Sequence, residues 1–155
     1  MRGLKLNLSN NDVTVIREKL IFHSTESLNG GDIPKANTAF KFAIKKICEI
    51  IKNKQFDSFF ELLFSDNPIV QEVMSLFLLP INERLAMKRL QRLRLGKSPV
   101  CNAAMLIQEY KKRRLKFPML VEDKVVYVSK EKFLEQLEDK DRGYMESILK
   151  ERKFI

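Results

Sequence analysis

Few residues of this 155-residue chain have the types and spacing that catalysis requires. His23 is the only histidine, which excludes a histidine-rich zinc site or a two-histidine metalloprotease helix. Cys48 and Cys101 are isolated from each other and from His23, so neither is expected to be an activated thiol or a zinc ligand. Gly30-Gly31 lacks the downstream Lys-Ser/Thr of a phosphate-binding loop. We therefore expect a non-enzyme without cofactor or metal, in which both cysteines are buried thiols.

Basic residues form the one constellation that suggests a function. Residues 81–118 contain eleven Lys/Arg against two Asp/Glu, whereas the segments on either side are nearly neutral at +1 and −1. The net charge of +9 is therefore concentrated in one stretch of the chain, which favours a localised electrostatic surface. The candidate partner-binding residues are Arg84, Lys88, Arg92, Arg94, Lys97, Lys111, Lys112 and Arg113.

Spacing gives part of this set a common direction. Arg84, Lys88 and Arg92 recur at every fourth position, which aligns them along one face of a helix. The cations at 111–116 close the next predicted helix, where the helix dipole alone favours positive charge. Two interpretations stay open at this point: a solvated basic face, and an interaction surface made by adjacent helical hairpins.

The elements that must position these residues are helices. With 45% hydrophobic residues, 32% charged residues, five Gly and five Pro, the chain is typical of one all-α domain over residues 1–155. Asn10, Asn11 and Asp12 predict the start of a first helix, and Asp32 with Pro34 predicts the start of a second that reaches about Asn53. Further helices are predicted from 56 to 64, after Pro68, and through the basic segment. The expected core positions are Ile16, Leu20, Phe40, Ala43, Ile47, Phe60, Leu63, Val73, Leu76, Leu90, Leu93, Ala104 and Ile107.

A weak internal repeat supports stacked helical hairpins. A shift of 31 residues places Pro68 on Pro99, and the list of further matches is Ile69 on Val100, Val73 on Ala104, Met74 on Met105 and Leu76 on Ile107. The matched positions recur at helical spacing after a turn in each copy. Because a single hairpin cannot bury its apolar stripe alone, hairpins of this kind are expected to stack side by side.

The pattern changes after Phe117-Pro118. Residues 119–128 contain two short apolar runs around Glu122-Asp123, which predict either a small β-hairpin or a buried extended strap. Ser129 is a predicted cap for a following helix, and a last helix is expected after an interruption at Arg142-Gly143. We treat residues 119–155 as a C-terminal extension of a core at 10–115.

Three short segments carry a resemblance to a known family. The segments 31–37 (GDIPKAN), 65–70 (SDNPIV) and 103–110 (AAMLIQEY) are similar to those of a bacterial HEAT-like helical-repeat domain family of unknown function. Some relatives of that kind are immunity proteins encoded beside secreted or contact-delivered toxins. The resemblance implies a HEAT-like α-α superhelix that binds and neutralises a cognate toxin domain. The alternative is a nucleic-acid-binding helical-repeat protein that uses the basic stripe in 81–118.

The expected location of the protein is the cytoplasm. No secretory signal is visible, and the longest apolar stretch, residues 75–81, is far shorter than the ~20 residues of a membrane span. The expected partner is a protein, with nucleic acid as the second choice, and binding to a membrane is not expected.

Overall fold

The computed structural model describes residues 2–28, 31–96, 102–152 and 154, with side chains placed for 12–25, 31–96, 102–152 and 154. Within these ranges the chain is mostly helical and contains one small antiparallel hairpin, as the composition predicted. The elements in order are α1 (Arg2–Leu28), α2 (Ile33–Lys52), α3 (Phe56–Leu63), α4 (Pro68–Leu78), α5 (Glu83–Leu95), α6 (Ala103–Lys111), β1 (Phe117–Val121), β2 (Lys124–Val128), α7 (Lys130–Leu134) and α8 (Asp139–Glu151).

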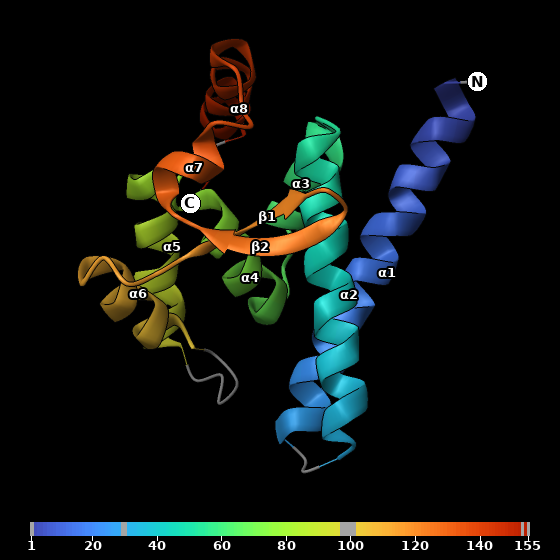
Figure 1. Ribbon diagram of the computed structural model, residues 1–155, viewed down its shortest axis with the longest axis vertical. Coiled ribbons are helices and arrows are strands. Elements are labelled where there is room, and N and C mark those ends of the chain that lie inside the picture. The colour runs from blue at the N-terminus through green and yellow to red at the C-terminus, as the bar shows by residue number, and fades with distance from the viewer. Residues whose placement is uncertain (1, 29–30, 97–101, 153, 155) are drawn as a thin grey trace.

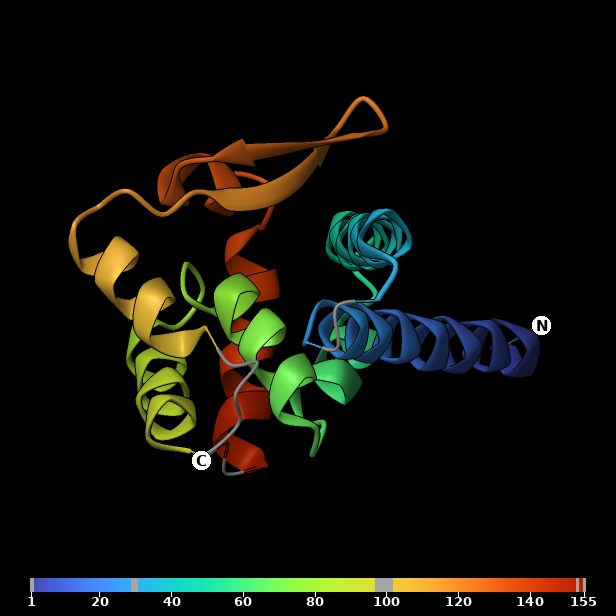
Figure 2. The ribbon, with the colours of Figure 1, turned by 90° about the horizontal axis from the view of Figure 1, so that it is seen from below.

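Helices α1 and α2 pack along each other as the longest pair in the molecule (Figure 1). The predicted start of α1 at 10–12 is wrong, because the helix begins at Arg2 and runs through these residues. Asn and Asp lower helix stability only slightly in a helix interior, and no Pro or Gly interrupts the sequence between Leu4 and Leu28. The N-terminal part of α1 consequently extends beyond the other helices in both views (Figures 1 and 2).

Helix α2 follows its sequence signals closely. The Lys35 amide donates a 3.1 Å hydrogen bond to the Asp32 carboxylate, and Pro34 lies in the first turn, where its missing N–H costs nothing. At the other end, Lys54 takes a left-handed conformation with φ 57° and closes the helix. The predicted cap at Asp32 and the predicted end near Asn53 are both confirmed.

Helices α3 to α6 pack as successive neighbours, and α3 also contacts the α1–α2 pair. The burial of α4 and α6 does not follow the 31-residue repeat: Met74 is fully buried, whereas its match Met105 is 54% exposed. Helix α6 also begins at Ala103, four residues after the position that matches the start of α4. The described residues therefore establish a helical domain and do not show a repeat superhelix. Pro99 and Val100, two of the matched positions, lie outside the described residues.

Residues 117–128 form a β-hairpin rather than an extended strap. Phe117 pairs with Val128 and Val121 with Lys124, and the two loop residues Glu122 and Asp123 have φ of 47° and 67°. Positive φ at both loop positions is the geometry that a tight two-residue hairpin requires. The strand β1 packs against α2, α4 and α7, so the hairpin closes one side of the helices and its tip lies above α2 (Figure 2).

The C-terminal helices join the hairpin to the rest of the domain. Ser129 caps α7 as predicted, because its hydroxyl accepts a 3.2 Å hydrogen bond from the Lys132 amide. The predicted interruption at Arg142-Gly143 is wrong, since α8 runs through both residues without a break. One glycine lowers helix stability by about 1 kcal/mol, which the surrounding turns of α8 tolerate.

Most of the predicted core is confirmed. Buried positions are Ile16, Leu20, Ala43, Ile47, Phe60, Leu63, Leu90, Leu93 and Ile107. Phe40, Val73 and Leu76 are partly buried and pack against this core, whereas Ala104 is exposed and was wrongly assigned. Helix α6 presents a neighbouring face, so Ala103 is buried instead of Ala104.

Candidate functional site

Helix α5 positions the predicted basic row. Its start is fixed by Asn82, whose side-chain oxygen accepts a 3.0 Å hydrogen bond from the Leu85 amide. One face buries four residues against the core, which turns the remaining faces toward solvent. Arg84, Lys88 and Arg92 are all exposed, as their four-residue spacing predicted. The buried residues of α5 are Ala86, Arg89, Leu90 and Leu93.

Two members of this row line a groove between α5 and α8. The α5–α8 groove has a volume of about 560 Å³, and its lining is Arg84, Leu85, Lys88, Gly143, Glu146, Ser147, Leu149, Lys150 and Phe154. Lys150 of α8 adds a third cation opposite Arg84 and Lys88. The one carboxylate, Glu146, is engaged by the Asn82 side-chain amide at 3.0 and 3.2 Å. The groove therefore combines a positive rim with an apolar floor.

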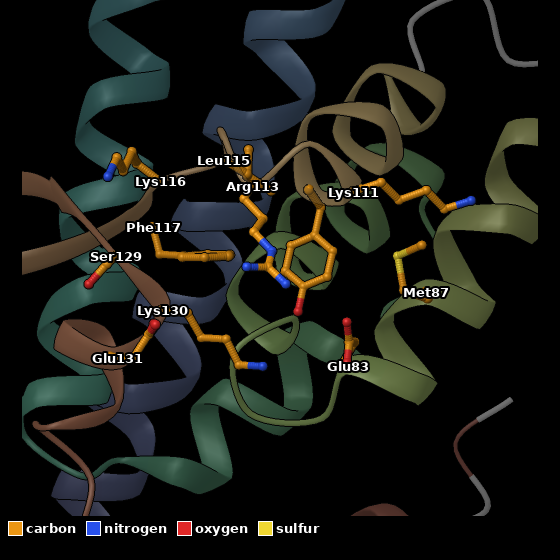
Figure 3. Close-up of a pocket in the computed structure, with 11 residues that line it drawn as sticks. Glu83, Met87, Lys111, Arg113, Leu115, Lys116, Phe117, Ser129, Lys130 and Glu131 are labelled. Carbon is orange, nitrogen blue, oxygen red and sulfur yellow. The ribbon is translucent and has the colours of Figure 1, made fainter.

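A second hollow lies on a neighbouring face of α5, between α6, the hairpin and the start of α7 (Figure 3). This Arg113 pocket has a volume of about 630 Å³, and its lining is Glu83, Met87, Tyr110, Lys111, Arg113, Leu115, Lys116, Phe117, Ser129, Lys130 and Glu131. Figure 3 shows Arg113 and Lys130 extending into the enclosed space, while Lys111 and Lys116 extend away from it. The pocket thus brings cations from two distant segments together.

The predicted site residues do not form one surface. Arg84 and Lys88 line the α5–α8 groove, whereas Lys111 and Arg113 line the Arg113 pocket. The rest of the set is exposed at helix ends, with Arg92 and Arg94 in the last turn of α5 and Lys112 at the C-cap of α6. Lys97 lies outside the described residues. Sequence reasoning missed Lys130 and Lys150, because only the fold brings these late residues next to α5.

Ion pairing differs between the basic segment and the rest of the described chain. In the part of the chain that the structure describes, no Lys or Arg between 81 and 118 forms an ion pair. Elsewhere in that part, the Lys residues in ion pairs are Lys35, Lys45, Lys46, Lys54, Lys132 and Lys140. No ion pair among the described residues therefore offsets these cations, although Glu146 lines the α5–α8 groove and Glu83 and Glu131 line the Arg113 pocket.

Arg89 adds a charge inside the domain that the sequence pattern did not identify. It is 4% exposed, donates a hydrogen bond to the Leu63 carbonyl, and lies 4.1 Å from the centre of the Phe154 ring. Burial, together with the charge of Arg92, lowers the pKa of Arg89 to about 10. The guanidinium nevertheless stays charged at neutral pH and contributes to the positive potential beneath the α5 surface.

The remaining groups with chemical potential are separated from each other. His23 stacks on Phe40 with ring centres 4.7 Å apart, and burial lowers the pKa of His23. Burial, and then Glu49, raises the pKa of Cys48 to about 12, so this thiol stays protonated and its predicted burial is confirmed. Cys101 lies outside the described residues. Among the described residues, no group of three or more His, Cys, Asp or Glu is arranged to hold a metal ion.

Comparison with family models, curated proteins and solved structures finds no match to this chain. Among the residues that the structure describes, no helix combines the length and the apolar character that crossing a bilayer requires. The charge and shape of the surface around α5 are therefore the features that bear on function.

Proposed function

We propose that this chain is a non-catalytic binding protein that docks an acidic surface of a protein partner at the α5–α8 groove. The observation that carries the proposal is that Arg84, Lys88 and Lys150 line the groove and that none of them forms an ion pair with a residue that the structure describes. Like charges held close together without counter-ions favour binding of an oppositely charged surface. The half-buried Leu85 in the same groove offers the partner an apolar contact as well, whereas Leu149 and Phe154 are almost fully buried.

The class of partner that we propose is a toxin domain, so that the chain acts as a cytoplasmic immunity protein. This part of the proposal comes from the resemblance of residues 31–37, 65–70 and 103–110 to a HEAT-like family. We further propose that the successive helix pairs, α1 with α2 and α4 with α5, are hairpins of the HEAT type. Their packing as sequence neighbours supports this relationship.

A charge-reversal experiment tests the proposal. The chain is co-expressed with a candidate toxin domain, and growth of the bacterial culture is measured. The wild type should restore growth, whereas Lys88→Glu combined with Lys150→Glu should abolish protection and weaken toxin binding at least tenfold. Lys41→Glu is a control on α2, because Lys41 is an exposed cation outside both hollows. Full protection by the double variant would refute docking at this groove.

The alternative function is nucleic-acid binding, favoured by the run of exposed cations Lys111, Lys112, Arg113 and Arg114 at the end of α6. If four of the basic residues contact phosphates of a duplex, the log of affinity should fall with log salt with a slope of about −3.6. Titration of labelled duplex and single-stranded RNA at two salt concentrations measures this slope. Steep, sequence-independent binding with micromolar or better affinity would favour the alternative over a protein partner.

A further inference from the structure

Helices α2 and α6 are each closed by a cationic residue that takes the left-handed backbone conformation, in place of the usual glycine. At the end of α2 the Lys54 amide donates to the Ile51 carbonyl over 3.1 Å, and at the end of α6 the Arg113 amide donates to the Tyr110 carbonyl over 3.0 Å. In each cap the following amide donates a 2.9 Å hydrogen bond to the carbonyl five residues earlier, from Gln55 to Ile50 and from Arg114 to Glu109. Lys54 has φ 57° and Arg113 has φ 58°, a left-handed conformation that glycine adopts most easily. Each position therefore keeps a long cationic side chain where glycine would be less strained.

The structure explains the cation at Lys54. Its ammonium lies 3.1 Å from the Asp141 carboxylate and 3.5 Å from Glu138, so it links the end of α2 to the start of α8. These contacts compensate for the backbone conformation. At Lys54, strain and side-chain pairing occur together.

Arg113 has the same backbone without the same compensation. Its guanidinium forms no ion pair with any residue that the structure describes, and it extends into the Arg113 pocket (Figure 3). Backbone strain that internal contacts do not explain is often located at binding sites. Because Arg113 is exposed and has no ion-pair partner among the described residues, its guanidinium is available to a group from outside the chain.

The pocket lining specifies what that partner carries. Arg113 and Lys130 extend into the space, whereas Lys111 and Lys116 extend away from it. Two carboxylates, Glu83 and Glu131, also line the pocket. One carboxylate, Glu83, interacts with the Tyr110 hydroxyl; burial, followed by this interaction and the charge of Glu131, raises the pKa of Tyr110 to about 12. The remaining walls include the half-buried Met87, Tyr110 and Leu115, which offer apolar and aromatic contacts, whereas Phe117 is almost fully buried behind them. A volume of about 630 Å³ lies within the range of small-molecule sites.

We propose that the Arg113 pocket binds a small ligand that carries an oxyanion, either a carboxylate or a phosphate, on an apolar or aromatic body. The planar guanidinium of Arg113 presents two parallel N–H donors that match two oxygens of such a group, and Lys130 supplies a second positive charge. The apolar body contacts Met87 and Leu115. This site lies apart from the α5–α8 groove and does not depend on the proposed function.

Binding of defined probes tests the site. Phenyl phosphate, phenylacetate and inorganic phosphate are titrated into the full chain, with benzyl alcohol as the uncharged control, and amide shifts are followed by NMR. We expect saturable millimolar or tighter binding of phenyl phosphate or phenylacetate, weaker binding of inorganic phosphate, and none of benzyl alcohol. Comparing the affinities of phenyl phosphate and phenylacetate identifies whether the site prefers phosphate or carboxylate. Absence of saturable binding by both aromatic anions would overturn the proposal.

Three variants separate the guanidinium from the fold. Arg113→Gly keeps the left-handed cap without its strain, so it should raise the unfolding temperature. Because it removes the guanidinium, it should also lower the affinity for the aromatic anion at least tenfold. Lys112→Ala removes a neighbouring exposed cation that does not line the pocket, and it should leave binding within twofold of wild type. Glu83→Gln should tighten binding, because it removes a negative charge from the lining. Unchanged affinity in Arg113→Gly would overturn the assignment of Arg113 as the anion ligand.

Discussion

Truncation of two leucines provides a direct test of the core. Leu90 on α5 is fully buried, whereas Leu76 on α4 is partly buried and lines a small pocket of about 200 Å³. Leu90→Ala leaves a closed cavity and should cost about 4 kcal/mol, in the upper part of the range for such changes. Leu76→Ala enlarges an opening that already exists and should cost about 2 kcal/mol, at the lower end of that range. Alanine has the highest helix propensity, so neither change weakens its helix directly.

Urea unfolding followed by far-UV circular dichroism measures both losses. With a slope of about 2 kcal/mol per molar urea, the midpoint should fall by about 2 M for Leu90→Ala and about 1 M for Leu76→Ala. The slope itself should stay constant, since both variants expose nearly the same surface on unfolding. Equal losses, or a larger loss for Leu76→Ala, would show that the packing of α4 and α5 is not as described.

Three further changes have defined outcomes. Gly143→Ala should stabilise the chain by about 0.5–1 kcal/mol in thermal unfolding, because Gly143 is in the interior of α8 and an added Cβ has no neighbour within 4 Å. Burial opposes ionisation of Asp141, but the Glu138 amide and Lys54 outweigh burial and lower the pKa of Asp141. The ionised carboxylate therefore stabilises the fold at pH values above its unfolded pKa, and this stabilisation is lost as the pH falls through the folded pKa. The stability gap between wild type and Asp141→Asn should therefore be larger at pH 7 than at pH 3. Phe154→Ala should cost about 3 kcal/mol, because Phe154 is 4% exposed and covers the buried guanidinium of Arg89.

Local signals in the sequence predicted the elements that depend on a few neighbouring residues. Asp32 with Pro34 predicted the start of α2, and Ser129 predicted the start of α7, because a capping side chain satisfies backbone groups within three residues of itself. The breaks predicted at 10–12 and at Gly143 failed for the opposite reason. At Gly143 the helix continues because Asp141 and Met145 on either side are buried, and at 10–12 it continues because Asn and Asp lower helix stability only slightly.

The candidate surfaces were predictable only in part. The row formed by Arg84 and Lys88 follows from helical spacing, so the sequence alone placed these residues on one exposed face. The sequence did not reveal that Lys150 faces this row, or that Lys130 faces Arg113, since those approaches depend on how α7 and α8 return to α5. Periodicity also could not distinguish buried Arg89 from its exposed neighbours, because the helix pattern around it is rich in cations.

Gly143 connects the stability of α8 to the α5–α8 groove. A helix interior normally favours alanine over glycine, and no steric contact at this position requires a glycine. Gly143 does, however, line the groove beside Lys88, so the absent side chain leaves room for a partner between the two helices. The local loss of helix stability is therefore consistent with a binding role for this space. A side chain larger than alanine at position 143 would preserve α8 and narrow the groove without changing its charges. Partner binding by such a variant would therefore show how much the shape of the groove contributes, apart from its charges.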